Sequence, residues 1–452
     1  MPDVQTPRKG IVSGSGVIIR GGRIIDRVGE RVADVAISAD GVIVGVDSAL
    51  DAGVLGLDDA IELDATGCII SSGLVDIHTH LREPGREEAE TVETGSRAAA
   101  LGGYTAVVAM PNTEPTIDSA AVVQQVLDAG VAAGLCDVRV AGAITVDRSG
   151  TTLAPMAEMA ALGVRMFTDD GCGVQDDRLM RRALEYSAGL SVPVTLAQHC
   201  EVEALSEGGH MHEGEWSSRL GLPGIPAEAE ELMVFRDIAL ARLTGARVHL
   251  QHLSTAGSVE LVRQAKAKGL PVTAEATPHH FTLTHAEVAS YDPVFKVNPP
   301  LRAAEDVAAV KAGLADGTID AIATDHAPHT AEVKEAPFDH APCGMLGLET
   351  ALALGISELV DPGVITMQQL LALMSWQPAV IAGIESVHGR AVAVGEPAHL
   401  VVFDPTQEWI VDPAKLASRS HNTPYAGRSV RGRVRHTLLC GVPMVMNGEA
   451  QR

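Results

Sequence analysis

The sequence predicts an α/β fold in which a TIM-like (β/α)8 barrel stands beside a small β-sandwich domain built from both chain ends. Three observations lead to this prediction: residues 1–70 read as all-β, apolar runs alternate with helical patterns through the middle of the chain, and strand patterns return near Ser386. We expect residues 1–68 and 386–452 to form the composite β-domain and residues 69–385 to form the barrel.

Strand and turn signals dominate both chain ends. The segment 17–25 places Gly21-Gly22 between apolar residues and predicts a β-hairpin with glycine in its turn. The segment 32–46 predicts a second hairpin around Asp40-Gly41 in the same way. Towards the C-terminus, strands are predicted at 391–394, at 400–403 and within 428–445. Because each end is too short to bury a core alone, we expect the two ends to pack together.

The middle of the chain, from Cys68 to about Gly383, alternates between strand and helix patterns. The apolar runs are 68–70, 104–109, 138–143, 164–167, 192–197, 248–250, 271–274 and 319–323. The helical patterns between them include 87–101, 120–133, 178–188, 228–243 and 257–268. This alternation favours a parallel (β/α)8 barrel. A doubly wound sheet is the alternative, but the GxGxxG loop that it predicts after the first strand is absent.

Composition and charge exclude several classes of function. Apolar residues make up 46% of the chain and charged residues 20%, which excludes overall disorder. The 34 basic and 58 acidic residues give a net charge of −24, which repels nucleic acid and anionic membranes. The N-terminal MPDVQTPRKG has no apolar signal region, no apolar run reaches a membrane-spanning length, and the six cysteines form no CxxC pair. We therefore expect a soluble, cytoplasmic protein with reduced thiols and no membrane or nucleic-acid partner.

Candidate metal ligands follow the predicted barrel strands. In Asp76-Ile77-His78-Thr79-His80, side chains two residues apart face the same side of a strand, so His78 and His80 can reach one Zn²⁺. Each candidate alone could be an ordinary polar side chain. In a barrel, however, the carboxyl ends of all strands converge on one mouth, and together the candidates predict a two-metal hydrolytic site. The later candidates are Asp169-Asp170, His199, His252 and Asp325.

These residues stand in segments that resemble the dihydroorotases of the amidohydrolase superfamily, of the class I bacterial type. The matching segments, which span nearly the full chain, are GLVDIHTHLREPG (73–85), AMPNTEPTID (109–118), FTDDGCGVQ (167–175), AQHCE (197–201), HLQHLSTA (249–256), EATPHHF (275–281), KVNPPLR (296–302), IATDHAPH (322–329) and GMLGLETAL (344–352). The resemblance implies a zinc enzyme, with two Zn²⁺ per subunit, that interconverts N-carbamoyl-L-aspartate and L-dihydroorotate in pyrimidine biosynthesis. A metal-activated hydroxide would be the nucleophile, since zinc lowers the pKa of bound water to roughly 7.

The resemblance also implies a role for each site residue. His78 and His80 would bind the first zinc, Asp170 would bridge the two, and His199 with His252 would bind the second. Asp325 would contact the first metal and act as general acid and base. The residues implied to bind substrate are Arg82, Asn112 and His329 at its carboxylate, Asn298 at its ring, and the backbone of Cys343 and Gly344 above that ring.

A carboxylated lysine bridges the metals in many members of this superfamily, and this chain lacks one in the relevant region. No lysine occurs between Lys9 and Lys266. Arg165, which follows Gly163-Val164, stays protonated and cannot form a stable carbamate. The bridge must therefore come from the Asp169-Asp170 pair; the resemblance favours Asp170, and Asp169 is left to orient a ligand.

The sequence disfavours two other functions. Another cyclic amidase, such as an allantoinase or a hydantoinase, is disfavoured by the set Arg82, Asn112 and His329, which suits a substrate carboxylate. A catalytically inactive homologue that scaffolds aspartate carbamoyltransferase would have lost metal ligands, and none is lost here. Association with that carbamoyltransferase and homo-oligomerisation stay open, and the charged segment 330–342 is either a lid over the site or a plain surface loop.

Overall fold

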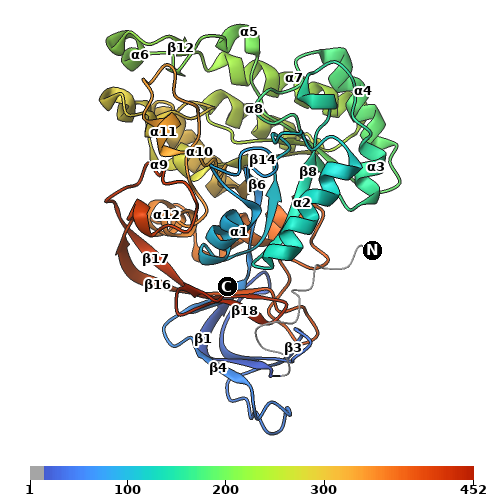
Figure 1. Cartoon of the computed structure of the whole chain (residues 1–452), viewed down its shortest axis with the longest axis vertical. Helices are drawn as coiled ribbons and strands as arrows, with labels where there is room; N and C mark the ends of the chain where they lie inside the picture. The colour runs from blue at the N-terminus through green and yellow to red at the C-terminus, as the bar shows by residue number, and fades with distance from the viewer. Residues whose placement is uncertain (1–14) are drawn as a thin grey trace.

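Eight parallel strands form a nearly closed barrel in the computed structural model, which describes residues 15–452 (Figure 1). Neighbouring barrel strands are also neighbours in chain order, and a parallel bridge between Thr79 and His326 brings the last strand beside the first. The predicted (β/α)8 architecture is therefore confirmed. The barrel strands are β6 (Leu74–Thr79), β7 (Tyr104–Ala109), β8 (Asp137–Gly142), β9 (Met166–Phe167), β10 (Thr195–Gln198), β13 (Val248–Leu250), β14 (Val272–Ala276) and β15 (Ala321–Ile322).

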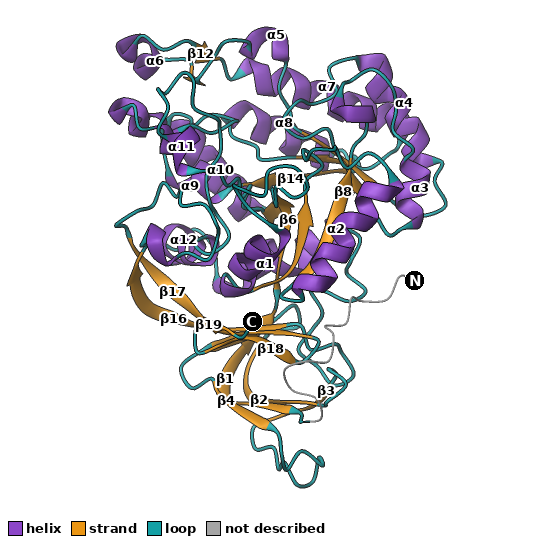
Figure 2. Ribbon diagram, in the orientation of Figure 1, coloured by secondary structure: helices purple, strands orange, loops and turns teal. Residues whose placement is uncertain are grey.

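Helices follow the barrel strands and enclose the barrel (Figure 2). The strand β7 shows why this layering arises, because all six of its residues are buried and it needs cover on both faces. The α-helices are α1 (Val92–Leu101), α2 (Ala120–Ala133), α3 (Met156–Ala161), α4 (Asp177–Ala188), α5 (Glu203–Ser206), α6 (Glu215–Leu220), α7 (Glu228–Thr244), α8 (Ala256–Ala267), α9 (Pro278–Thr282), α10 (Ala304–Asp316), α11 (Ala331–Lys334), α12 (Ala351–Gly355), α13 (Met367–Leu371) and α14 (Gln377–Ile381). A two-stranded sheet of β11 (Met211–His212) and β12 (Gly224–Ile225) lies within the segment between β10 and β13.

A second sheet, of nine strands, combines both ends of the chain below the barrel (Figure 1). The strand β5 is hydrogen bonded to β1 on one side and to β16 on the other, so it joins the N-terminal and C-terminal strands into one continuous sheet. Its core includes Ile19, Val35, Ile70 and Val402, which come from both ends. The nine strands are β1 (Val17–Ile25), β2 (Glu30–Ile37), β3 (Ile43–Asp47), β4 (Ile61–Asp64), β5 (Ile69–Ser72), β16 (Leu400–Ile410), β17 (Ser429–Leu439), β18 (Val442–Met446) and β19 (Glu449–Ala450).

Three local predictions at the chain ends are wrong. Residues 17–25 form one strand, because Gly21, at a φ of 70°, sits in a bulge of β1 instead of in a hairpin turn. The run 68–70 belongs mainly to β5 of the nine-stranded sheet, and the first barrel strand is β6. Residues 391–394 form no strand. The hairpin of β2 and β3 around Asp40-Gly41 is confirmed.

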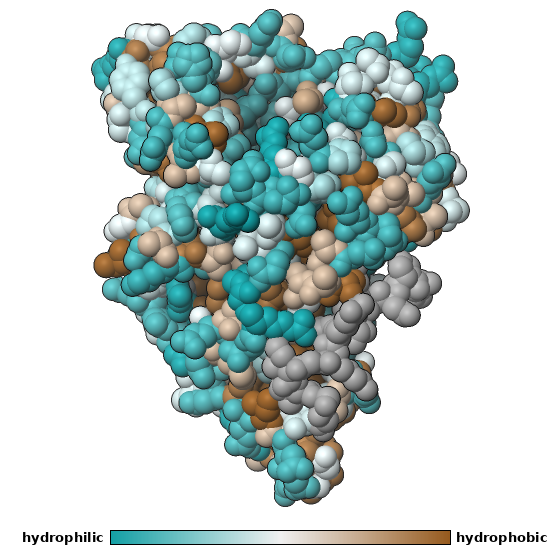
Figure 3. Space-filling model, viewed as in Figure 1, coloured by the Kyte–Doolittle hydropathy of each residue, from teal (hydrophilic) through white to brown (hydrophobic). Residues whose placement is uncertain are grey.

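The division into a β-domain of residues 1–68 and 386–452 and a barrel of residues 69–385 stays a prediction. The N-terminal part of the nine-stranded sheet extends to Ser72, at the end of β5. The expectation that MPDVQTPRKG carries no signal region concerns residues that lie outside those described. Among residues 15–452, no helix has the length and apolar character needed to cross a membrane. The face drawn in Figure 3 is largely hydrophilic, with scattered apolar patches.

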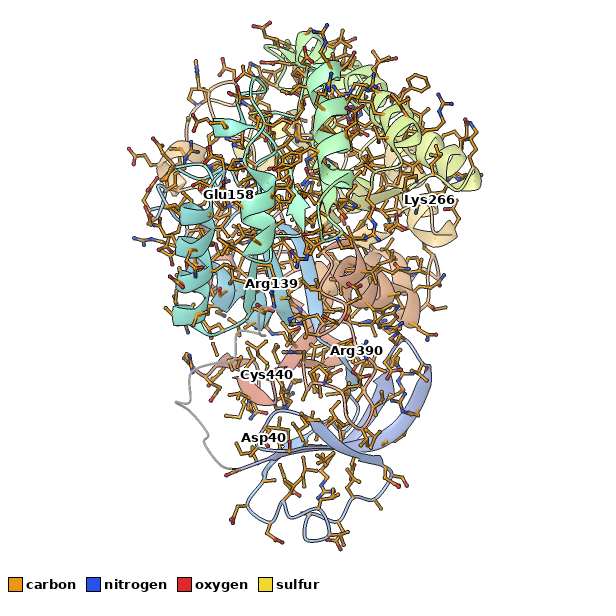
Figure 4. All side chains as sticks on the ribbon, turned by 90° about the vertical axis from the view of Figure 1, so that its right-hand side faces the viewer. Asp40, Arg139, Glu158, Lys266, Arg390 and Cys440 are labelled. Atoms are coloured by element: carbon orange, nitrogen blue, oxygen red, sulfur yellow. The ribbon has the colours of Figure 1, made fainter. Side chains whose placement is uncertain are left out.

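A buried polar network joins the barrel to the nine-stranded sheet. His388 donates from Nε2 to Asp137 of β8 at 2.9 Å, and Arg139 donates to the same carboxylate oxygen at 2.7 Å. The His388 and His399 rings lie 4.3 Å apart, and the backbone N–H of Cys440 donates to Nδ1 of His399. Figure 4 shows Arg139 near the lower end of the barrel, above Cys440. The network therefore fixes the sheet against the end of the barrel opposite the predicted metal site.

Candidate metal centre

All six predicted metal ligands lie at the carboxyl ends of barrel strands. Each is almost fully buried. Their donor atoms form two groups, each with its atoms within 4.8 Å of one another: His78, His80 and Asp170 in the first, and Asp170, His199 and His252 in the second. Asp170 belongs to both groups, and Asp325 borders the first. The strands that position the ligands are β6 for His78 and His80, β9 for Asp170, β10 for His199, β13 for His252 and β15 for Asp325.

Asp170 lies between the imidazoles of both groups. Its Oδ1 atom is 3.3 Å from Nε2 of His78, 3.9 Å from Nδ1 of His199 and 3.8 Å from Nε2 of His252. Its Oδ2 atom is 3.6 Å from Nε2 of His80. A single carboxylate surrounded by four imidazoles has the geometry expected of a ligand shared by two cations.

Asp169 faces away from the imidazoles. Its carboxylate accepts hydrogen bonds from the backbone N–H groups of Ile144 and Thr145, at 2.8 and 3.0 Å, and from the Thr145 hydroxyl. These contacts tie the end of β9 to the segment after β8, and so fix the backbone of the next residue. Arg165 also lies apart from the site, where its guanidinium donates to the carbonyls of Ala160 and Val164.

Asp325 lies beside the first group of donor atoms. Its Oδ1 atom lies 2.8 Å from Nε2 of His80 and 3.6 Å from Nε2 of His78. The buried carboxylate of Asp76 holds the strands that carry these residues, because it accepts from the backbone N–H groups of His78 and Thr324 and from the Thr324 hydroxyl. The carboxyl ends of the neighbouring strands β6 and β15 are thereby held together.

Three site residues adopt a left-handed backbone conformation that is uncommon for side chains larger than glycine. The φ angles are 62° for Arg82, 34° for His252 and 48° for Asp325. Such conformations cost of order 1–3 kcal/mol each and concentrate at functional sites. Here each one turns a side chain at a strand end towards the cavity described below.

The electrostatics of the site follow from carboxylates and imidazoles buried together. Burial alone would lower the pKa of His78, but Asp170, Glu275 and Asp325 outweigh it and raise that pKa well above its usual value. Burial likewise opposes ionisation of Asp170 and Asp325, yet the neighbouring imidazoles hold both pKa values well below the usual range. The ionised carboxylates therefore make a negatively charged cluster that favours a proton or a metal cation on the imidazoles.

The donor set suits Zn²⁺. Imidazole nitrogens and carboxylate oxygens are its common ligands in proteins. Nε2 of His78 is buried and has no hydrogen-bond partner among the described residues, whereas Nδ1 of the same ring is engaged by Glu275. A buried nitrogen directed at Asp170 without a hydrogen bond is what a metal ligand requires. The residues present thus fit the metal that the sequence predicts.

A cavity of about 330 Å³ opens over the metal ligands, and five of the six line it. Arg82 and His329 form one part of its wall: Nη2 of Arg82 lies 3.3 Å from Nε2 of His329, which donates to the Cys343 carbonyl at 2.7 Å. Asn112 and Asn298 reach the metal ligands, at 2.8 Å from His80 and 3.4 Å from His199. Of the twelve predicted site residues, only His78 does not line the cavity; the lining ones are His80, Arg82, Asn112, Asp170, His199, His252, Asn298, Asp325, His329, Cys343 and Gly344.

The cavity wall at Arg82 and His329 pairs a buried cation with an imidazole. Burial lowers the pKa of Arg82 to about 10, so the guanidinium is charged at neutral pH. Burial and the charge of Arg82 together lower the pKa of His329 to about 3, so that imidazole is neutral. Together these groups offer one fixed positive charge and a neutral imidazole beside the metal ligands.

The sequence prediction missed two groups that orient the ligands. Glu275 of β14 accepts hydrogen bonds from Nδ1 of His78 at 2.6 Å and from Nε2 of His249 at 3.0 Å. Glu201 lies 3.8 Å from Nε2 of His199. Both glutamates stand within the segments EATPHHF and AQHCE, so their proximity to strand ends was the available signal.

Comparison with known proteins agrees with this site. A family model described as "Dihydro-orotase-like" matches residues 67–258. Dihydroorotase from Streptomyces coelicolor is 50% identical over 438 residues, 96% of this chain and 99% of that relative. Dihydroorotase from Mycobacterium tuberculosis is 50% identical over 437 residues, with the same coverage.

Solved structures share the fold at lower identity. L-hydantoinase (dihydropyrimidinase) from Arthrobacter aurescens has a TM-score of 0.84 at 24% identity, covering 97% of this chain and 98% of that one. Dihydropyrimidinase from Brevibacillus agri has a TM-score of 0.81 at 24% identity, covering 96% of each chain. These likenesses establish the barrel fold, and the full-length identity to the dihydroorotases establishes the family. The chain belongs to the dihydroorotase family.

Proposed function

We propose that this protein is a zinc-dependent dihydroorotase, which reversibly cyclises N-carbamoyl-L-aspartate to L-dihydroorotate in pyrimidine biosynthesis. One observation carries the proposal: four imidazoles surround the Asp170 carboxylate at the floor of a cavity whose wall contains the buried cation Arg82. The full-length relatives named above are dihydroorotases. A metal centre and a carboxylate-binding cation in one cavity match a substrate that carries a hydrolysable ring amide and a carboxylate.

The ligand roles follow from the two groups of donor atoms. His78, His80 and Asp325 would hold one Zn²⁺, His199 and His252 a second, and Asp170 would contact both. When bound, the metals would polarise the amide carbonyl and lower the pKa of the attacking water. Asp170, rather than Asp169, is proposed as the shared ligand because the Asp169 oxygens are occupied by Ile144 and Thr145.

Asp325 is proposed as the general acid and base. Its carboxylate is buried at the cavity floor, within 2.8 Å of His80, and it is ionised because neighbouring imidazoles lower its pKa. In the hydrolytic direction it takes a proton from the attacking water and delivers it to the leaving ring nitrogen. In the cyclising direction it removes the proton from the ureido nitrogen of carbamoyl aspartate, and that nitrogen attacks the carboxyl carbon. Asp325 returns the proton to the departing carboxyl oxygen as the C–O bond breaks, and this oxygen leaves as water after taking up one further proton from solvent.

Arg82 is proposed to bind the free carboxylate of the substrate. A guanidinium can donate two parallel hydrogen bonds to a carboxylate, which fixes both the position and the angle of the substrate. Nε of Arg82 donates to the Pro328 carbonyl at 3.1 Å, so the fork is held in place before substrate arrives. Asn112 and His329 flank it, while Asn298 and the backbone of Cys343 and Gly344 would contact the ring.

Other expectations from the sequence are proposed with this function. A cytoplasmic location, association with aspartate carbamoyltransferase and assembly into a homo-oligomer would each suit a biosynthetic enzyme of this kind. The segment 330–342 is proposed to be a fixed wall, because the buried amine of Lys334 donates to the carbonyls of Pro293 and Pro342 at 2.7 and 3.0 Å. These contacts attach the segment to the loop that carries Asn298.

A comparison of substrates tests the proposed function. Purified protein should cyclise carbamoyl aspartate at mildly acidic pH, hydrolyse dihydroorotate at higher pH, and turn over allantoin and hydantoin far more slowly. Metal analysis by inductively coupled plasma mass spectrometry should find about two zinc ions per chain, as expected for paired sites. Turnover of hydantoin above that of dihydroorotate would refute the substrate assignment, and activity at full rate after complete chelation would refute the metal centre.

A further inference from the structure

The connection between β16 and β17, residues 411–428, leads from the nine-stranded sheet to the mouth of the barrel. Figure 1 shows the two strands extending towards α12, which β17 contacts. Beyond the strands, the backbone N–H of Arg419 donates to the carboxylate of Glu90 at 3.0 Å. The Ser420 hydroxyl donates to the carbonyl of Ala89 at 2.7 Å. Both acceptors belong to the loop that follows β6, so a C-terminal segment of the chain is fixed beside the site.

Asn422, in this connection, uses its whole side-chain amide to bind backbone groups of two other loops. Its Nδ2 donates to the carbonyls of Ala327 and Gly344, at 3.0 and 3.1 Å. Its Oδ1 accepts from the backbone N–H of His329 at 3.1 Å, and its own carbonyl accepts from the backbone N–H of Leu346 at 3.2 Å. The residue is 7% exposed, and both amide protons and the amide oxygen are engaged.

The three residues whose backbone groups the Asn422 side chain binds all line the cavity over the metal ligands. They are Ala327, His329 and Gly344. Asn422 itself lies behind this wall and is not one of its lining residues. In the proposed function, His329 flanks the substrate carboxylate and Gly344 contacts the ring. Asn422 can therefore affect the substrate only through the positions of these residues.

The loops around Ala327 and Gly344 depend on such contacts because they lack regular secondary structure. Residues 327–330 and 341–344 lie outside helices and strands. The loops pack closely, since a Cβ at Gly344 would lie 2.8 Å from Cβ of Ala327. A buried backbone group that loses its hydrogen-bond partner costs free energy, so the amide of Asn422 favours the arrangement in which all three groups are paired. A side chain from the C-terminal part of the chain thus holds the two loops in one relative position.

We propose that Asn422 is a positioning residue for the substrate, because its amide holds the loop of His329 against the loop of Gly344 and keeps the cavity wall formed. The identity of the substrate, dihydroorotate or carbamoyl aspartate, rests on the proposed function. The metal ligands are held by other groups, among them Asp76 and Glu275. Loss of the amide should therefore reduce the fraction of molecules with a formed wall, which weakens substrate binding by that fraction and leaves the chemistry unchanged.

Steady-state kinetics of dihydroorotate hydrolysis by Asn422→Asp test the proposal. The aspartate keeps the acceptor for His329 but presents an oxygen, in place of the donor, to two carbonyls. KM should rise by about tenfold, the effect expected when two hydrogen bonds no longer hold the wall. The value of kcat should change by about twofold or less, because these contacts are equal in the ground state and the transition state. A purely structural role would instead reduce the amount of folded enzyme, and so lower kcat at an unchanged KM.

Two further variants complete the kinetic test. Asn422→Ala removes all three hydrogen bonds without placing an oxygen against the carbonyls, so it should raise KM even where the aspartate variant does not fold. Asn447→Asp makes the same chemical change in the exposed turn between β18 and β19, and its KM should equal that of wild type. Zinc content and circular dichroism of all variants should match wild type.

Hydrogen–deuterium exchange tests the positioning role without substrate. The backbone N–H groups of residues 327–329 and 343–346 should exchange faster in Asn422→Ala than in wild type, whereas residues 74–79 of β6 should exchange alike in both proteins. A wild type that does not turn over dihydroorotate would refute the proposed function itself. An active wild type, with KM and exchange unchanged in the Asn422 variants, would overturn the positioning role alone.

Discussion

The carboxylate of Glu275 accepts a hydrogen bond from Nδ1 of His78 at 2.6 Å. Its second oxygen accepts from Nε2 of His249 at 3.0 Å, and the His249 ring accepts from the Thr273 hydroxyl at 2.8 Å. The chain of bonds from β14 through β13 to β6 holds the proton of His78 on Nδ1 and leaves Nε2 directed at Asp170. Glu275 is thus a positioning residue for the first metal site.

Replacement of Glu275 by Gln should weaken zinc binding. The contacts with His78 and His249 lower the pKa of Glu275 to about 2 against the opposing effect of burial, so the wild-type group is a full anion that increases the basicity of His78. A neutral amide removes that charge, and loss of such a partner typically lowers metal affinity by about 10–100-fold. Competition with a chelator of known affinity measures the zinc dissociation constants directly.

The control for this experiment is Glu349→Gln, which replaces a partly buried carboxylate outside the metal centre. Its zinc affinities should equal those of wild type. Equal affinities for Glu275→Gln and wild type would show that the hydrogen bond is structural only and does not tune the metal site.

Asp325→Ala should abolish turnover while the fold persists. Loss of a general acid and base typically costs about 10²–10⁴-fold in rate, and here one oxygen ligand of the first group is lost as well. Zinc analysis should still detect the second site, because His199, His252 and Asp170 are untouched. Steady-state rates in both directions and a thermal melt measure the two effects, with exposed Asp339→Ala as the control. A rate within tenfold of wild type would mean that another group moves the proton.

Arg82→Lys should impair binding of the substrate carboxylate. The lysine ammonium keeps the charge but cannot make two parallel hydrogen bonds, and one hydrogen bond to a charged group contributes about 1.5–3 kcal/mol. The value of kcat/KM for dihydroorotate should fall by about 10–100-fold on that basis. Arg86→Lys changes a more exposed arginine of the same cavity wall and should alter kcat/KM by about twofold or less. Equal losses in the two variants would contradict a special role for Arg82.

Strand and helix periodicity predicted the barrel because its strands are buried and because the helices α1, α2, α4, α7 and α8, of 10 to 17 residues, are long enough to show their period. The choice of sheet for a single strand could not be predicted in the same way. The runs at Ile69 and Leu74 are separated by Gly73 and are equally apolar, yet one joins β1 and the other joins β7. Pairing partners, rather than local hydrophobicity, decide that assignment. Likewise, a glycine at position 21 is compatible with a β-bulge and with a hairpin turn, so its presence alone does not distinguish the two structures.

The metal ligands could be predicted because they follow barrel strands, and the carboxyl ends of barrel strands converge on one mouth. That rule alone brings together His78 and Asp325, which are 247 positions apart in the sequence. It placed Glu275 near a strand end but could not show that Glu275 joins His78 to His249, because that contact depends on the register of β13 against β14. The exact direction of Asp169 and Asp170 depends on backbone hydrogen bonds to Ile144 and Thr145, which no spacing in the sequence encodes.

Stability should depend on pH through Glu349, a partly buried carboxyl in the junction between α12 and the nine-stranded sheet. Burial raises the pKa of Glu349 from 4.5 to about 7, although the backbone N–H of Ala417 and the charge of Arg433 oppose the rise. Between pH 4.5 and 7 the folded protein keeps this proton and the unfolded chain loses it. The stabilisation from Glu349 is therefore complete below pH 4.5 and is lost as the pH rises through 7.

Glu349→Gln removes this titration, so the variant should gain stability relative to wild type as the pH rises from 4.5 to 7. At about 1.4 kcal/mol per pKa unit the difference reaches at most about 3 kcal/mol, and residual solvent contact should reduce it to ~1–2 kcal/mol. Urea unfolding followed by circular dichroism at several pH values measures it. The control is Glu158→Gln, an exposed glutamate of α3, whose stability curve should run parallel to that of wild type. Parallel curves for Glu349→Gln and wild type would mean that Glu349 is ionised in the folded protein at neutral pH.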